Sequence, residues 1–115
     1  MMEEGAVTTV QVRVHYASDR DLGAWSQRMF YDVDPNARRR VVAEFALEVK
    51  PKVRGVPEAL TPLEVAKYVF VGFSGVGPPL AAFRKSGARL MSVGDVVEVD
   101  GVKFLRTLTG FERVP

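Results

Sequence analysis

Cysteine is absent from this chain, and His15 is the only histidine. Without cysteine there are no disulfides, no thiolate nucleophiles and no cysteine-based zinc sites. The longest mainly apolar stretch, YVFVGF at residues 68–73, is far shorter than the roughly 20 residues that span a bilayer. The N-terminal MMEEGAVTTV is acidic and does not have the pattern of a signal peptide. We therefore expect a cytoplasmic protein with no membrane contact, no cofactor and no metal.

Side-chain amides are scarce as well, since Asn36, Gln11 and Gln27 are the only ones. Arginine outnumbers lysine by 11 to 5. Few thermolabile amides and abundant charge fit a thermophilic source. A GC-rich genome gives the same bias, so both explanations remain open.

The chain is the size of one ordinary domain. It has 115 residues, of which 47% are hydrophobic and 26% charged, as is typical of a folded globular protein. There is no internal repeat or long linker, so residues 1–115 are expected to form a single domain. The net charge of +2 permits nucleic-acid binding but does not argue for it.

The N-terminal half predicts three strands. VQVRVHY, residues 10–16, alternates apolar and polar residues, which is typical of a strand with one buried face. ASDRDLG, residues 17–23, predicts a loop, and the aromatic residues of WSQRMFYDV, residues 25–33, favour a second strand. In RRVVAEFALEVK, residues 39–50, alternate positions from 41 to 49 are apolar. This predicts a long strand paired with residues 25–33 across a turn at Asp34-Pro35.

Helices are expected in the middle of the chain, after a connection at residues 51–60. In TPLEVAKYVFVG, Thr61 can be the N-cap, Pro62 the first helical residue and Glu64 the partner in a capping box. Gly72 is the expected C-terminal stop. A short second helix is predicted in PPLAAFRKSG, beginning at Pro79 and ending at Gly87.

The C-terminal third predicts a β-hairpin, because Asp100-Gly101 suits a type I′ turn. Pairing outward from this turn matches apolar residues with apolar ones and acids with bases. The predicted pairs are Val99 with Val102, Glu98 with Lys103, Val97 with Phe104, Val96 with Leu105 and Asp95 with Arg106. The segment TGFERV is expected to add a final extended stretch after Gly110.

These elements predict a single α+β domain. It contains a mainly antiparallel sheet, with a partly open barrel as an alternative, and one or two helices before the C-terminal hairpin. Within the sequence GDVV, Gly94 and Asp95 are interpreted as the start of a hairpin strand rather than as a catalytic site.

Other candidate sites have simpler structural explanations. His15 falls on the polar face of the first strand, and no Ser, Cys or Asp is linked to it by a motif. The D-x-D pairs at residues 19–21 and 32–34 are not part of an EF-hand and are expected to form turns. GFSGVG, residues 72–77, matches neither a nucleophile elbow nor a phosphate loop, and is interpreted as the exit from a helix.

Three basic clusters are the candidate binding residues for nucleic acid. If they converge on one face with Tyr31 or Trp25 exposed nearby, they can bind phosphates and stack bases. A solvated surface with salt bridges to the 14 acidic residues is the alternative. The clusters are Arg38, Arg39 and Arg40; Lys50, Lys52 and Arg54; and Arg84, Lys85 and Arg89.

The C-terminal residues 82–114 resemble a group of short, uncharacterised bacterial proteins. Some of these proteins are encoded on plasmids and other mobile elements. They resemble one another and the YodL-like proteins in a segment of the form R-S-L-S-V-G-D-V-V, followed by a short turn, an aromatic strand and G-F or G-W. Leu90 departs from this pattern, which has serine there. The resemblance implies no known activity and favours a small accessory or interaction protein. The matching residues are Arg89, Met91, Ser92, Val93, Gly94, Asp95, Val96, Val97, Phe104, Gly110 and Phe111.

Three functional hypotheses follow. The first is a non-enzymatic binding module that acts on a protein partner or on itself as a homo-oligomer, through the edges of its sheet. The second is a nucleic-acid-binding accessory protein that uses the basic clusters. The third is a small enzyme built around His15 and a D-x-D pair, which requires a pocket that brings these residues together.

Overall fold

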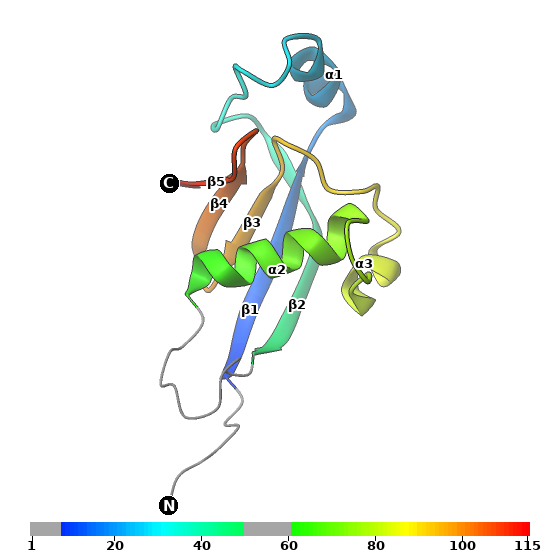
Figure 1. The fold of residues 1–115 in the computed structure, drawn as a ribbon, viewed down its shortest axis with the longest axis vertical. Coiled ribbons are helices and arrows are strands. Elements are labelled where there is room, and N and C mark those ends of the chain that lie inside the picture. The colour runs from blue at the N-terminus through cyan, green and yellow to red at the C-terminus, as the bar shows by residue number, and fades with distance from the viewer. Residues whose placement is uncertain (1–7, 50–60) are drawn as a thin grey trace, which may run out of the picture.

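The computed structural model describes residues 8–49 and 61–115. Their five strands form one antiparallel sheet in the order β2-β1-β3-β4-β5, which is not closed into a barrel (Figure 1). The α+β class with a mainly antiparallel sheet is therefore confirmed. The strands are β1 Thr8–Ala17, β2 Arg39–Val49, β3 Val96–Val99, β4 Val102–Arg106 and β5 Phe111–Val114.

Three helices accompany the sheet, namely α1 Asp19–Gln27, α2 Pro62–Ser74 and α3 Ala81–Ser86. Figure 1 shows α2 crossing one face of the sheet, α3 beside β2, and α1 at one end of the strands. In the described parts of the chain, no helix has the length and apolar character needed to cross a membrane.

The core lies between the sheet and α2. Alternate residues of β1, from Val10 to Tyr16, are buried, as the sequence pattern predicts. They pack with buried residues of α2, β3 and β4 in one hydrophobic cluster. From α2 this cluster takes Val65, Ala66, Val69 and Phe73.

Helix α2 begins as predicted. The Thr61 side chain accepts a hydrogen bond from the Glu64 backbone N–H at 3.2 Å, and the Thr61 backbone N–H donates to Glu64 Oε1 at 3.1 Å. The expected stop at Gly72 is wrong, because the helix continues to Ser74 and Gly75 is its left-handed C-cap. Gly72 is buried, and a Cβ added there would overlap Leu80 Cγ, so a larger residue would displace the Leu80 side chain.

The predicted strand at residues 25–33 is wrong, and so is the loop expected immediately before it. Helix α1 forms there, because the Ser18 hydroxyl caps it by accepting from the Asp21 N–H at 3.1 Å. Trp25 is the one buried residue of this helix and lies against Gly94. Capping and the burial of Trp25 thus override the strand propensity of the aromatic residues.

The partner predicted for β2 is consequently wrong as well. Strand β2 pairs with β1, from Thr8 opposite Val49 to Ala17 opposite Arg39, with a register shift between Val14 and His15. The shift is a bulge around Val42, which moves Val41 off the apolar parity and leaves it 47% exposed. Because β1 also pairs with β3, β2 becomes an edge strand of the described sheet.

The C-terminal hairpin has the predicted register. Val99 lies opposite Val102 and Val96 opposite Leu105, and both turn residues have positive φ, 47° at Asp100 and 85° at Gly101. The expected final extended stretch is confirmed as β5.

Gly94 occupies a site that only glycine suits. Its φ is 98°, and a Cβ there would lie 2.8 Å from the ring of Trp25.

Gly94→Ala is therefore expected to lower the free energy of unfolding by about 2 kcal/mol or more, as measured by urea denaturation. Gly23→Ala is the matched control. Gly23 lies inside α1, and no atom lies within 4 Å of the position that an added Cβ would take, so the substitution is expected to raise the free energy of unfolding by about 0.5–1 kcal/mol. Equal stability of the two variants would contradict this role for Gly94.

Candidate functional site

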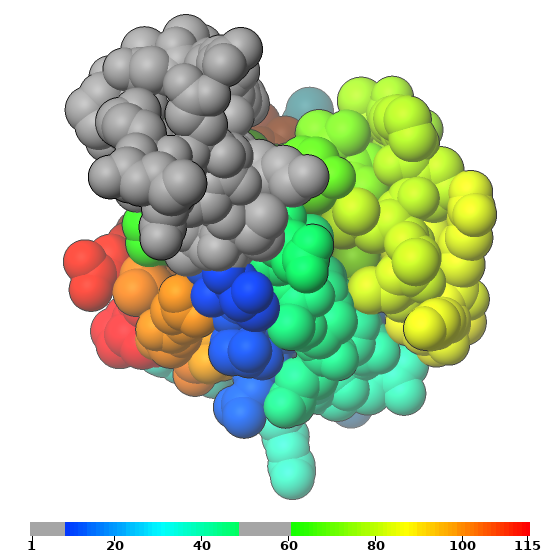
Figure 2. Space-filling view, turned by 90° about the horizontal axis from the view of Figure 1, so that it is seen from below, coloured from blue at the N-terminus to red at the C-terminus, as the bar shows by residue number. Residues whose placement is uncertain are grey.

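Two cavities follow one another along the outer side of β2. The first, about 620 Å³, has residues 38–40 on one side and residues 87–89 on the other. The second, about 520 Å³, lies between residues 42–47 and residues 80–86. We call them together the edge groove, with a basic end at the first cavity and an apolar end at the second. Figure 2 shows the neighbouring elements, with β2 in green between β1 in blue and the α3 region in yellow.

The apolar end is made by side chains that partly belong to the core. Phe45 stacks on the buried Phe73, with ring centroids 6.0 Å apart, which holds one wall in place. Glu44 and Lys85, both exposed, add one charge of each sign to the lining. The apolar lining comes from Val42, Ala43, Phe45, Ala46 and Leu47 of β2 and from Leu80, Ala81 and Ala82.

Beside the basic end lies a buried ion pair between Arg89 and Asp95. Asp95 is fully buried, and its two carboxylate oxygens accept from Arg89 Nη1 at 2.7 Å and Nη2 at 3.0 Å. The backbone N–H groups of Ala17, at 3.0 Å, and Ser92, at 2.8 Å, donate to the same carboxylate. Desolvation lowers the pKa of Arg89, but the hydrogen bond and the charge of Asp95 outweigh it, so the net pKa is raised. The buried charge is thus matched by four donors.

Tyr16 lies against this pair. Its hydroxyl donates to the Arg89 carbonyl at 2.8 Å, and the Arg89 guanidinium carbon lies 4.2 Å from the centroid of its ring. Burial, with the negative charge of Asp95 as a second cause, raises the pKa of Tyr16 well above its ordinary value. Tyr16 is therefore a neutral hydrogen-bond donor that joins the end of β1 to the segment after α3.

Arg39 holds the loop before β2. Its guanidinium donates to the carbonyls of Gly94 at 2.8 Å, Ala37 at 2.9 Å and Asp34 at 2.9 Å, and lies 5.6 Å from the ring centroid of Trp25. Burial lowers the pKa of Arg39. These contacts engage all three guanidinium nitrogens, so Arg39 supports the fold next to the groove.

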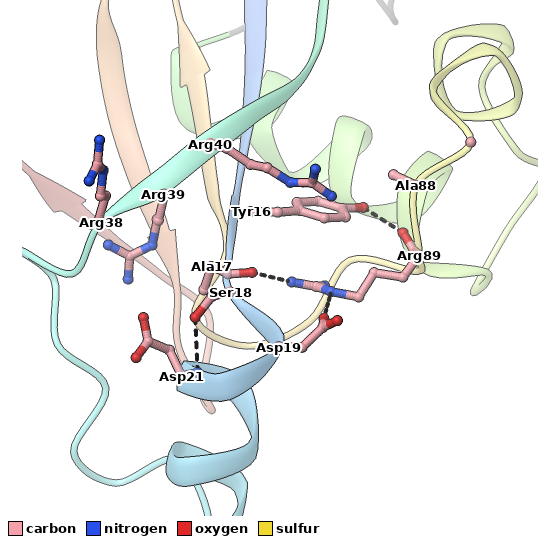
Figure 3. Close-up of a pocket in the computed structure, with 11 residues that line it drawn as sticks. Tyr16, Ala17, Ser18, Asp19, Asp21, Arg38, Arg39, Arg40, Ala88 and Arg89 are labelled. Carbon is pink, nitrogen blue, oxygen red and sulfur yellow. Dashed lines mark hydrogen bonds and ion pairs between the residues drawn. The ribbon is translucent and has the colours of Figure 1, made fainter.

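Arg38 and Arg40 are the exposed arginines at this end. Neither side chain makes a hydrogen bond or ion pair with another described residue. Figure 3 shows the Arg40 side chain extending over Tyr16 toward the segment of Ala88 and Arg89, whereas Arg38 points to the other side of β2. Arg40 is therefore the available cation that crosses the basic end.

The structure brings together only part of the predicted basic set. Arg38, Arg39, Arg40 and Arg89 all line the basic end, and Lys85 lines the apolar end. Arg84 is exposed on α3. Lys50, Lys52 and Arg54 lie outside the described residues. Of the two aromatic residues considered for base stacking, Tyr31 is 79% exposed and Trp25 is buried.

The other sequence candidates occupy structural positions. The sequence pattern places His15 on the polar face of the first strand, without a catalytic partner. Its Nε2 lies 2.9 Å from Glu98 Oε1, and only 15% of its side chain is exposed, so it is not freely solvated. Asp19 and Asp21 belong to the first turn of α1 rather than to a turn between strands. In the described ranges, no group of three or more potential ligands is arranged to hold a metal ion.

Asp95 also has a different partner from the one predicted. Its backbone does lie opposite Arg106, whose N–H donates to the Asp95 carbonyl at 2.9 Å. The Arg106 side chain, however, lies over the ring of Phe70, 4.4 Å from the centroid. Its guanidinium therefore does not compensate the Asp95 carboxylate, and Arg89 does so instead.

Comparisons of this chain with protein-family models, with curated proteins and with solved structures found no match.

The Arg89–Asp95 pair is expected to be essential for stability. Arg89→Met leaves a fully buried carboxylate without its cation, and should lower the free energy of unfolding by about 3–5 kcal/mol in urea denaturation. Arg84→Met removes the same charge from an exposed site on α3 and should change stability by no more than about 0.5 kcal/mol. If both variants are equally stable, the pair does not have the importance assigned to it.

Proposed function

We propose that this chain is a non-enzymatic binding module that accepts an extended segment of a protein partner along β2. The observation that carries this proposal is the position of β2, an 11-residue edge strand with the edge groove along its outer side. An edge strand presents unpaired N–H and C=O groups, which form main-chain hydrogen bonds with an added strand.

The groove supplies the side-chain contacts that such a mode needs. Residues 43–49 of β2 follow the bulge and keep a regular register with β1. A strand added here directs every second side chain to the same face of the sheet. The partner side chains on the face that carries Phe45 and Leu47 would enter the apolar end and pack against Leu80 and Ala82.

The roles already taken by polar side chains favour binding over catalysis. Arg39, Arg89 and Asp95 are engaged in contacts that hold the loop, the strand and the segment after α3 together. His15 is paired with Glu98 on the face of the sheet away from α2, separate from the edge groove. Arg39, Arg89, Asp95 and His15 therefore have structural roles, and no reacting group is assigned among them.

Self-association through β2 is supported less well than binding of another protein. A two-fold contact between two copies of β2 requires the same register on both strands. The bulge around Val42 interrupts that register and gives local twist, a common protection of edge strands. Residues 43–49 remain regular, and they suffice for a short partner strand.

Nucleic-acid binding is the alternative raised by the basic clusters. The convergence of four arginines at the basic end speaks for it. Against it, Arg39 and Arg89 are engaged, Arg38 and Arg40 extend in different directions, and Asp19 and Asp21 line the same cavity. A phosphate backbone would meet these carboxylates, so we favour a protein partner.

The resemblance of residues 82–114 to the YodL-like proteins is in keeping with this proposal. That resemblance favours an accessory or interaction protein. Arg89, Gly94 and Asp95, three of the matching residues, form or flank the buried pair beside the groove. We propose that the shared segment maintains the architecture of this end of the domain.

Selection from a displayed library of random peptides tests the proposal. The wild-type protein is expected to enrich peptides with alternating apolar residues, and Ala81→Trp, which fills the apolar end from an exposed position, should lose that enrichment. Ala24→Trp is the matched control on an exposed site of α1 and should retain it. No enrichment by the wild type, or equal enrichment by Ala81→Trp, would overturn the proposal.

Fluorescence anisotropy with single- and double-stranded probes across a salt series tests the alternative. We expect no binding by the wild type at physiological salt. Salt-sensitive binding by the wild type would instead favour nucleic acid, provided that two variants weaken it. Binding should be lost when Arg38, Arg39 and Arg40 are changed together. A folded variant with both Arg38→Gln and Arg40→Gln should still bind, but more weakly than the wild type.

A further inference from the structure

We propose that the edge groove recognises the C-terminus of its partner, with the terminal carboxylate bound by Arg40. This inference rests on the proposed function and names the chemistry of the ligand. The ligand is an extended peptide end, antiparallel to β2, that has apolar side chains at alternate positions and a free α-carboxylate.

The direction of the peptide follows from the order of the two ends of the groove. The apolar end lies along residues 42–47 of β2, and the basic end lies along residues 38–40. A peptide whose terminus reaches Arg40 therefore runs opposite to β2, and its preceding residues cover the apolar end. About six extended residues, at roughly 3.3 Å each, match the six β2 residues that line this end.

The bulge explains why the peptide should end at Arg40. The bulge at Val42 interrupts the regular pairing between β1 and β2, which continues in a shifted register from Val41 to Arg39. A peptide strand added to residues 43–49 loses its ladder at the same point. A chain terminus suits this position, because a terminal residue does not need a continuing register.

The charges around the basic end favour a single anion. The Arg40 guanidinium makes no contact with another described charged group and extends across the cavity above Tyr16, as Figure 3 shows. A carboxylate can accept two parallel N–H bonds from such a guanidinium. On the far side of the cavity, Asp19, whose side chain is 96% exposed, and Asp21 disfavour a chain that continues with acidic residues.

Arg89 contributes to the field without being a ligand itself. Its Nη1 and Nη2 groups are bonded to Asp95, and its Nε lies 3.7 Å from Asp19 Oδ1. Its charge is therefore compensated by two carboxylates. Arg40 is the residue on which the recognition of the terminus depends.

Matched peptides that end in a carboxylate or in an amide test this inference. The probes are three fluorescein-labelled six-residue peptides in which serine alternates with valine, leucine or phenylalanine, each ending in the apolar residue. In fluorescence polarisation, the free-acid form of the best binder is expected to bind the wild type about tenfold more tightly than its amide.

Two charge-matched variants assign the effect to the groove. Arg40→Gln should bind acid and amide forms alike, at the weaker affinity. Arg113→Gln removes an exposed arginine from β5, the opposite edge of the sheet, and should keep the tenfold preference. Equal affinity of the wild type for both forms, or a preference that persists in Arg40→Gln, would overturn the inference.

The same experiment separates this inference from the proposed function. If both forms bind the wild type equally and Ala81→Trp abolishes binding, the groove binds peptides but does not recognise their termini. If no peptide binds, or if Ala81→Trp binds as well as the wild type, the proposed function itself is wrong.

Discussion

The structure around the candidate site depends on the burial of one charged group. The Asp95 carboxylate has no exposure to solvent, and four donors from three parts of the chain satisfy it. Removing such a group from water is costly unless it is paired and hydrogen-bonded. The end of β1, the segment after α3 and the turn before β3 must therefore come together for the fold to be stable.

The edge groove is a consequence of that arrangement. The Arg89 side chain reaches Asp95 only if the segment after α3 passes the end of β1, and this path leaves β2 as one wall and residues 80–89 as the other. Tyr16 then lies next to Arg89. Arg40 lies opposite Tyr16 in the β1–β2 ladder, and its side chain extends over the Tyr16 ring. An internal stabilising pair thus places Arg40, which forms no ion pair with another described residue, at the end of an apolar groove, and the inference about the partner's C-terminus rests on this placement.

Most elements of the fold could be predicted from the sequence, but the groove could not. The strand β1, the capping box of α2 and the Asp100-Gly101 hairpin each have a signal within a few residues, and all three formed as expected. The helix α1 also had a local signal, a Ser18 N-cap followed by acidic residues, which resembles a turn when taken alone. Because that helix was missed, β2 was given the wrong partner, and its exposed edge was not foreseen.

The sequence by itself determined where apolar and polar faces alternate, where helices can begin and which turn closes the hairpin, because these properties depend on neighbouring residues. Only the tertiary structure decided which charges meet. The hairpin register pairs Asp95 with Arg106, but in the folded chain the Asp95 carboxylate binds Arg89, and the Arg106 guanidinium lies over the ring of Phe70. The tertiary structure likewise separated three adjacent arginines into one that supports a loop and two exposed ones. Strand β2 begins at Arg39, so its pairing sends the side chains of Arg39 and Arg40 to opposite faces, and Arg38 lies before the strand.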